Sequence, residues 1–170
     1  YDPDRLNYDK EMLRRFYLKH GYVDFEVQKA AAELLPDKSG FTLTMRIKEG
    51  QRYRFEQPEI KVSLPEYAKK GNKAELVKLL EFEKGDRFNA ELIDSTIEAL
   101  TDKFADDGYA FVEVVPEFKK NEKDRTVKII FRVQEGEKVF INKINIHGNS
   151  RTQDKVIRRE FRLKEGDAFN

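Results

Sequence analysis

Three short motifs recur in the same order along the chain, and this repeat restricts the fold more than any other feature of the sequence. The matching pairs are HGYV at 20–23 with DGYA at 107–110, IKEG at 47–50 with VQEG at 133–136, and KGDRFN at 84–89 with EGDAFN at 165–170. Equivalent glycines in these pairs are 87, 86 and 81 residues apart. Glycine dipeptides are common, but a shared order at nearly constant spacing indicates repeated structural modules.

The middle of the chain, residues 54–137, has the pattern of one complete module. Apolar residues at alternating or helical spacing predict the order strand, helix, helix, strand, strand. The expected elements are a strand at 59–64, a helix from Asn72, a helix from Asn89 to Gly108, a strand from Ala110 to Pro116 and a strand at 127–133. Asn72 with Glu75 three residues later, and Asn89 before an apolar stripe, are typical of helix starts.

The two ends of the chain repeat parts of this pattern. Residues 1–53 predict helix, strand, strand, and residues 138–170 predict strand, helix. The expected elements are a helix at 4–20 capped by Gly21, a hairpin of 23–29 with 41–47, a strand at Ile144–Ile146 and a helix at 152–163. Because the chain starts at Tyr1 without Met, we expect it to be a piece of a longer protein.

The composition excludes several classes of function. Lys and Arg total 33 against 32 Asp and Glu, with both signs interleaved, so we expect no nucleic-acid partner. The sequence has no cysteine, which excludes disulfides, thiol catalysis and Cys-based metal sites. The longest apolar runs are too short for a membrane-spanning helix.

No residue set is typical of catalysis or of cofactor binding. His20 and His147 have no partner at triad or ligand spacing, and the Asp106–Asp107 pair lacks the spacing of a calcium loop. The glycine motifs at 84–86 and 165–167 are not phosphate-binding loops, because neither is a glycine-rich turn after a buried strand. We therefore expect no enzyme activity, no cofactor and no metal.

The unit order and its motifs resemble POTRA domains, specifically those of BamA-type outer membrane assembly factors. The stretches that carry the resemblance are Leu13–Tyr17 running into Gly21–Tyr22, Glu33–Asp37, Glu49–Tyr53, Ile146–Thr152 and Val156–Glu160. The resemblance implies an α+β fold of tandem β-α-α-β-β modules, each with a three-stranded mixed sheet covered on one face by two antiparallel helices. Residues 1–53 would be the second half of a third module, 54–137 a complete fourth, and 138–170 the start of a fifth. The loop from Leu64 to Gly71 is longer than the family pattern.

The resemblance also implies a function without chemistry. The region would be a periplasmic scaffold of a Gram-negative outer membrane protein, and its partners would be unfolded outer membrane proteins, accessory lipoproteins and the membrane β-barrel of the same protein. One alternative is a two-partner secretion transporter that recognises a single exported substrate. Another is a small enzyme of similar topology, which would need a cluster of titratable residues in one pocket.

The predicted sheets have open edges, and an open edge can accept an extended partner strand. In the POTRA arrangement the last strand is central, so the strand after the helices lies at an edge. The residues expected to bind a partner strand are Val23, Asp24, Phe25, Glu26, Val27, Gln28 and Lys29 in the first unit, and Ala110, Phe111, Val112, Glu113 and Val114 in the complete one. Because Pro116 removes a donor from the second edge, the first is the better predicted docking strand.

Two further interactions are expected. By resemblance, Arg158 and Glu165 are the positions that would dock an accessory lipoprotein, although a solvated charged face would give the same pattern. Residues 1–53 and 138–170 together supply the elements of one module, and neither can bury its apolar face alone. We therefore expect self-association in which these parts are exchanged between chains.

Overall fold

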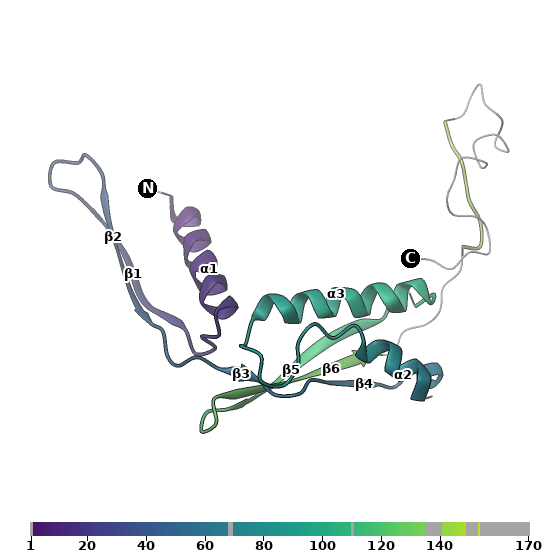
Figure 1. Ribbon diagram of the computed structural model, residues 1–170. Coiled ribbons are helices and arrows are strands. Elements are labelled where there is room, and N and C mark those ends of the chain that lie inside the picture. The colour runs from purple at the N-terminus through teal and green to yellow at the C-terminus, as the bar shows by residue number, and fades with distance from the viewer. Residues whose placement is uncertain (1, 68–69, 110, 135–140, 149–152, 154–170) are drawn as a thin grey trace.

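The computed structural model describes residues 2–67, 70–109, 111–134, 141–148 and 153. Its elements along the chain are α1 (Pro3–Lys19), β1 (Glu26–Leu34), β2 (Phe41–Lys48), β3 (Arg54–Phe55), β4 (Glu59–Val62), the 3₁₀ turn η1 (Pro65–Tyr67), α2 (Lys70–Val77), α3 (Ala90–Asp106), β5 (Glu113–Asn121) and β6 (Thr126–Gln134). Figure 1 shows the hairpin of β1 and β2 and the helix α1 extending away from a larger unit built from the later elements. No helix within the described ranges is long and apolar enough to cross a membrane.

The sheet of the larger unit is built around β6. β5 pairs with β6 in antiparallel orientation from Glu113 opposite Gln134 to Asn121 opposite Thr126. On the other side, β3 and β4 both pair with β6 in parallel orientation. These two short strands therefore act as one interrupted edge strand, and the sheet has the three-stranded mixed form expected for a module.

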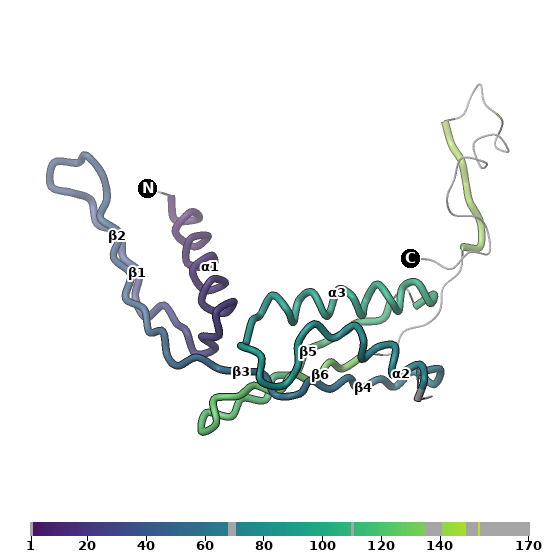
Figure 2. The backbone as a smooth tube through the Cα atoms, in the orientation of Figure 1, coloured from purple at the N-terminus to yellow at the C-terminus, as the bar shows by residue number. Residues whose placement is uncertain are grey.

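Two helices cover one face of this sheet (Figure 2). α3 begins at Asn89, whose side chain accepts the N–H of Glu91 at 2.9 Å, as the sequence predicts. The apolar face of α3 packs on alternate residues of β6. The residues in this contact are at most 5% exposed: Ile93, Leu100 and Phe104 on α3, and Val127, Ile129, Phe131 and Val133 on β6. Burial of this apolar stripe is the main stabilising contribution to the unit.

The other face of the sheet carries ion pairs. Lys128 on β6 lies 2.8 Å from Glu59 on β4, and Arg132 on β6 pairs with Glu117 on β5. Ile130 lies between these charged residues on β6 and is only 1% exposed. The aliphatic stems of charged side chains can cover an apolar residue in this way, so this face offers little apolar surface to a partner.

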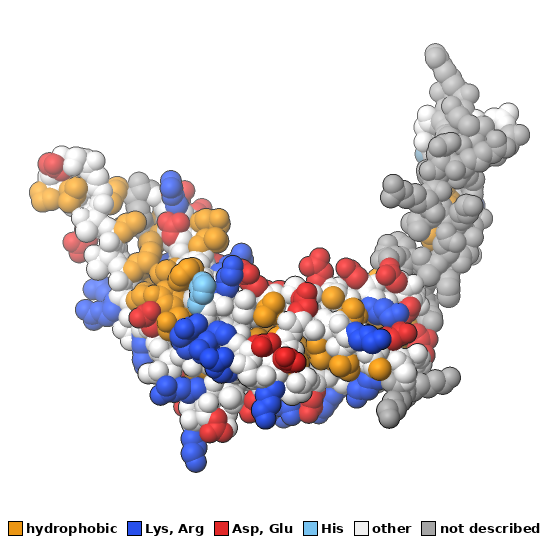
Figure 3. All heavy atoms as spheres, in the orientation of Figure 1, with side chains coloured by type: hydrophobic (Ala, Val, Ile, Leu, Met, Phe, Trp, Pro, Cys, Tyr) orange, Lys and Arg blue, Asp and Glu red, His pale blue; other side chains and the backbone are white. Residues whose placement is uncertain are grey.

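The first unit has the predicted helix and hairpin but a thin core. Leu35 donates its N–H to Gly40 at 2.9 Å, which closes the turn between β1 and β2. Tyr17 of α1 stacks on Phe25 with ring centroids 4.2 Å apart. No residue of α1 is fully buried. Large apolar side chains remain exposed over this unit, among them Tyr8, Met12, Phe16, Leu34 and Leu43. Figure 3 shows hydrophobic side chains, in orange, gathered over the first unit.

Several predicted bounds were wrong. β1 starts at Glu26 instead of Val23, because residues 22–25 form a turn in which Phe25 donates to the carbonyl of Tyr22. β5 starts at Glu113, after Phe111 and Val112, and continues through Pro116 to Asn121. The predicted start, Ala110, lies outside the described residues. A proline need not end an edge strand, since its missing donor can lie on the side without a partner.

Two predictions outside the sheet edges also need correction. Asn72 lies inside α2 and donates its side-chain amide to the carbonyl of Glu66, so it anchors η1 and does not cap the helix. Residues 141–148 form no strand, although Ile144 and Ile146 alternate with polar residues. A segment in which apolar and polar residues alternate forms a strand only where a neighbouring strand supplies backbone hydrogen bonds. Residues 141–148 join no sheet in the described structure. The predicted helix at 152–163 lies outside the described residues.

Candidate functional site

The outer edge of β5 is open. In the described part of the chain, β5 pairs with β6 alone. Pro116 lies in this ladder opposite Phe131, so its nitrogen faces away from β6. Backbone groups alternate along an antiparallel strand, and the N–H groups of Val114, Phe118 and Lys120 therefore also face the open side. The edge offers hydrogen-bonding groups to an extended chain at every second residue, with one donor missing.

The outer edge of β1 has the same character. β1 pairs with β2 from Glu26 opposite Lys48 to Leu34 opposite Phe41, and with no other described strand. Because Leu35 points its N–H at Gly40, alternation directs the N–H groups of Leu34, Ala32 and Ala30 outward. A register shift between Val27 and Lys29 marks a bulge at the start of the strand. Beyond the bulge, the regular pairing of β1 with β2 covers residues 29–34.

A polar cluster joins the two edges. Asp24, in the turn before β1, accepts from the Lys120 ammonium at 2.6 Å and from the Tyr53 hydroxyl at 2.8 Å. The hydrogen bond from Lys120 holds the pKa of the Asp24 carboxyl below its ordinary value, and the hydroxyl of Tyr53 acts in the same direction. The same pair raises the pKa of Lys120. Burial is the main cause that raises the pKa of Tyr53.

Backbone contacts fix the same junction from its other side. Tyr53 donates its N–H to the carbonyl of Gly21 at 2.8 Å and accepts from the N–H of Phe88 at 3.0 Å. Gly21 has φ +94°, and a Cβ added there would lie 2.6 Å from Cδ of Arg87. Arg87 also donates to the Tyr53 carbonyl at 3.3 Å. The junction is therefore a packed contact between the two units.

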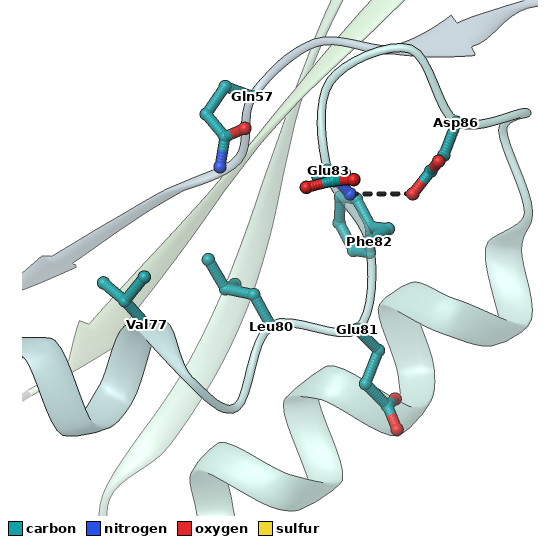
Figure 4. A pocket seen from close by; sticks show the side chains of 7 residues that line it. All are labelled: Gln57, Val77, Leu80, Glu81, Phe82, Glu83 and Asp86. Carbon is teal, nitrogen blue, oxygen red and sulfur yellow. Dashed lines mark hydrogen bonds between the residues drawn. The ribbon is translucent and has the colours of Figure 1, made fainter.

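A pocket of about 390 Å³ lies on the larger unit, away from both edges. Its lining is Gln57, Val77, Leu80, Glu81, Phe82, Glu83 and Asp86 (Figure 4). The backbone N–H of Glu83 donates to Asp86 at 2.9 Å, which fixes the acidic loop. The described lining contains neither histidine nor a hydroxyl group. Among the described residues, no group of three or more histidines and carboxylates could hold a metal ion.

The structure separates the predicted partner-binding residues into different environments. Glu26, Val27, Gln28 and Lys29 lie on β1, and Glu113 and Val114 lie on β5. Phe111 and Val112 precede β5, whereas Val23, Asp24 and Phe25 belong to the junction. Phe25 is 8% exposed and belongs to the core of the first unit. Ala110, Arg158 and Glu165 lie outside the described residues.

Sequence reasoning missed Tyr53, Lys120 and Arg87, which build the junction. Tyr53 and Lys120 are far from Asp24 in the sequence, with separations of 29 and 96 residues. Tyr53, three residues after Gly50, was a usable signal, because a tyrosine that becomes buried needs a polar partner for its hydroxyl. Lys120 gave no such signal, because nothing in the sequence distinguishes it from the other lysines.

Comparison with known proteins decides the family. The model of the POTRA family, described as a surface antigen variable number repeat, matches residues 1–50, 61–136 and 139–170. The chain belongs to the POTRA family. This membership confirms the resemblance inferred from the motifs and, with the structural match below, the tandem α+β fold.

The curated relatives are outer membrane protein assembly factors. The chain is 29% identical to the outer membrane protein assembly factor BamA of Buchnera aphidicola over 100% of this chain and 27% of that protein. It is 28% identical to BamA of Neisseria meningitidis over 100% of this chain and 21% of that protein. The crystal structure of Haemophilus influenzae BamA POTRA3-5 matches with a TM-score of 0.79 at 25% identity, covering 97% of this chain and 63% of that one. The chain thus spans about a quarter of the length of these curated relatives, and it is similar to the POTRA region of an assembly factor.

Proposed function

We propose that this POTRA region is a periplasmic, non-enzymatic scaffold that binds extended segments of unfolded outer membrane proteins along its open strand edges. The proposed division is 1–53 as the end of one module, 54–137 as a complete module and 138–170 as the start of the next. The similarity to BamA over the whole chain supports the cellular role. The observation that carries the binding mode is the outer edge of β5, with which none of the described strands pairs.

The energetics of edge pairing suit a transient scaffold. A segment that pairs with about half of a strand forms three or four backbone hydrogen bonds, each contributing about 0.5–1.5 kcal/mol net. Association itself costs roughly 4–15 kcal/mol. Edge pairing alone is therefore weak, and it tolerates many sequences because it recognises the backbone. Both properties fit a surface that receives and releases different barrel precursors.

Site-specific photo-crosslinking in the full-length protein tests this function. A benzoylphenylalanine at Phe118 on β5 or at Ala32 on β1 is expected to form adducts with several unfolded outer membrane proteins. The matched control at Asp102, an exposed position on α3, is expected to form none. Equal labelling at all three positions would contradict binding at the edges. Adducts with one exported protein alone would indicate a dedicated transporter instead.

We propose a second docking role for Arg158 and Glu165, based on the family resemblance alone. These residues would bind an accessory lipoprotein through charge pairs. Charge reversal, Arg158→Glu or Glu165→Lys, is expected to reduce capture of that lipoprotein from cells. Crosslinking of precursors at Phe118 should stay unchanged, which separates the two roles. Unchanged capture by both variants would remove this assignment.

A further inference from the structure

The contacts at the junction determine which sides of the two sheets face the same way. Gly21 accepts the N–H of Tyr53, which directly precedes β3. Three residues later, Asp24 binds Lys120 on β5. Since β3 and β5 lie on opposite sides of β6, residues 21–24 lead from the β3 side toward the β5 side, and Asp24 lies between Tyr53 and Lys120. β1 therefore starts on the β5 side, and β2 returns to Tyr53 on the β3 side.

This crossing places both open edges on one side of the molecule. The edge of β5 that faces away from β6 and the edge of β1 that faces away from β2 point in the same lateral direction. The two strands also run in the same direction along these edges. β5 ends at the junction, at Lys120, and β1 begins there. Asp24 lies only two residues before Glu26, roughly 7 Å of extended chain.

We infer that the outer edges of β5 and β1 form one edge track, along which a single extended polypeptide segment pairs with both modules in one direction. A segment that is antiparallel to β5 is then antiparallel to β1 as well, without reversing at the junction. This inference rests on the proposed edge-binding function and adds the length and the continuity of the bound segment.

The side chains along the track fit an extended segment with large alternating side chains. The middle of β1 consists of three small residues, Ala30, Ala31 and Ala32. Their side chains project little from either face of the strand and leave room for larger side chains of a partner. Phe118 on β5 is 54% exposed and Leu34 on β1 is 51% exposed, so each edge has a large apolar side chain next to outward backbone groups. Such side chains pair well across neighbouring strands with aromatic or β-branched residues. Barrel strands that alternate in this way have the matching chemistry.

The track predicts a minimum length for tight binding. Its two strands and the junction need a segment of about 20 residues at roughly 3.3 Å each. The Asp24–Lys120 pair holds the two edges in line, which makes pairing with the second edge an intramolecular step. Linked binding of this kind raises affinity by about 10²-fold or more over one half alone. Lys120 is therefore a positioning residue for the bound segment.

Peptide binding to the 170-residue chain tests the track. The probes are a peptide of about 22 residues, with alternating tyrosine and threonine and a Gly-Ser centre, and its halves of about 10 residues. The long peptide is expected to bind about 10²-fold more tightly than a half. If the halves bind and the long peptide is no tighter, the track is wrong and the edge-binding function stands. If no peptide binds, the edge-binding function itself fails.

Variants show whether both edges contribute. Ala32→Pro and Phe118→Pro each remove one outward donor without touching a ladder hydrogen bond, and Ala32→Val and Phe118→Val keep it. Each proline variant is expected to reduce the long-peptide affinity to nearly that of a half, and each valine control to preserve it. Lys120→Met should remove the gain of the long peptide and leave the halves unchanged. Circular dichroism verifies folding of every variant, and an unchanged gain in Lys120→Met would overturn the alignment role.

Crosslinkers at the two ends of the long peptide give an independent readout. One end is expected to label β1 alone and the other end β5 alone. Labelling of both strands by the same end would mean that two separate segments bind, which overturns the track.

Discussion

The Lys120 ammonium lies 2.6 Å from the carboxylate of Asp24, 96 residues earlier in the chain. This pair connects the end of β5 to the turn before β1 and so joins two repeated units through their side chains. Asp24 also accepts from Tyr53, which lies in the connection between the units. The junction therefore depends on one carboxylate with two donors, and its removal should be measurable.

Asp24→Asn is expected to lower the free energy of unfolding by about 1 kcal/mol, because a charge-assisted hydrogen bond becomes a neutral one at a partly exposed site. Urea denaturation measures this loss. The control Glu122→Gln removes the weaker partner of Lys120, at 3.3 Å, and should change stability by less than about 0.5 kcal/mol. Equal losses in both variants would contradict a special role for Asp24.

The same pair predicts a pH dependence. The pKa of Asp24 is lowered from 3.8 in the folded chain, so its contribution is present above that value and is lost as the pH falls through the folded pKa. The pKa of Lys120 is raised from 10.5, so its contribution is present below that value and is lost as the pH rises through the folded pKa. The stability difference between wild type and Asp24→Asn should therefore be constant near neutral pH and shrink at both extremes.

Gly21→Ala tests the close contact at the junction. Gly21 and Gly85 have nearly equal positive φ angles, +94° and +93°, but a Cβ meets Arg87 only at Gly21. Gly85→Ala is expected to cost about 1 kcal/mol from the backbone alone. Gly21→Ala should cost clearly more, by thermal unfolding. In the double variant with Arg87→Ala, the extra destabilisation of Gly21→Ala over Gly85→Ala should disappear, once the effect of Arg87→Ala alone is subtracted. If it remains, the strain does not come from the contact with Arg87.

The order of elements was predictable because it depends on local patterns. The stripe of α3, its Asn89 cap and the alternation of β6 are all encoded within one turn or one strand. Strand starts were less predictable, because Val23 and Phe25 alternate like a strand while Phe25 packs on Tyr17. Alternating apolar residues indicate which side chains are buried. An aromatic side chain that is buried from a turn, such as Phe25, gives the same pattern as one in a strand.

The open edges were predictable in kind, and the junction between them was not. The edge position of β5 follows from the module order, since the last strand pairs on both sides. The contact of Lys120 with Asp24 depends on the angle between units, which no local pattern encodes. The bulge near Gln28 was missed for a related reason, because nothing in the residues of one strand fixes its register against another.

Tyr67 in the lengthened loop is expected to anchor that loop. It is 4% exposed, packs edge-to-face on Phe104 with ring centroids 5.1 Å apart and donates its hydroxyl to Asp107. Burial and this hydrogen bond raise the pKa of Tyr67. Tyr67→Phe should lower the free energy of unfolding by about 1 kcal/mol, since one hydrogen bond is lost while the packing is kept. Tyr8→Phe, at a position 64% exposed, is the control and should be neutral.

The first unit is expected to associate with a second copy of the chain. By the repeat spacing, Leu43 on β2 corresponds to Ile129 on β6, yet Leu43 is 52% exposed and Ile129 is fully buried. In the complete module, β4 pairs along the far edge of β6, and α2 belongs to the same helix layer. We propose that residues 138–170 of another chain supply the equivalent strand and helix. Sedimentation should show dimers that weaken in Leu43→Lys but persist in the surface control Lys61→Glu, whereas a well-folded monomer at all concentrations would exclude the exchange.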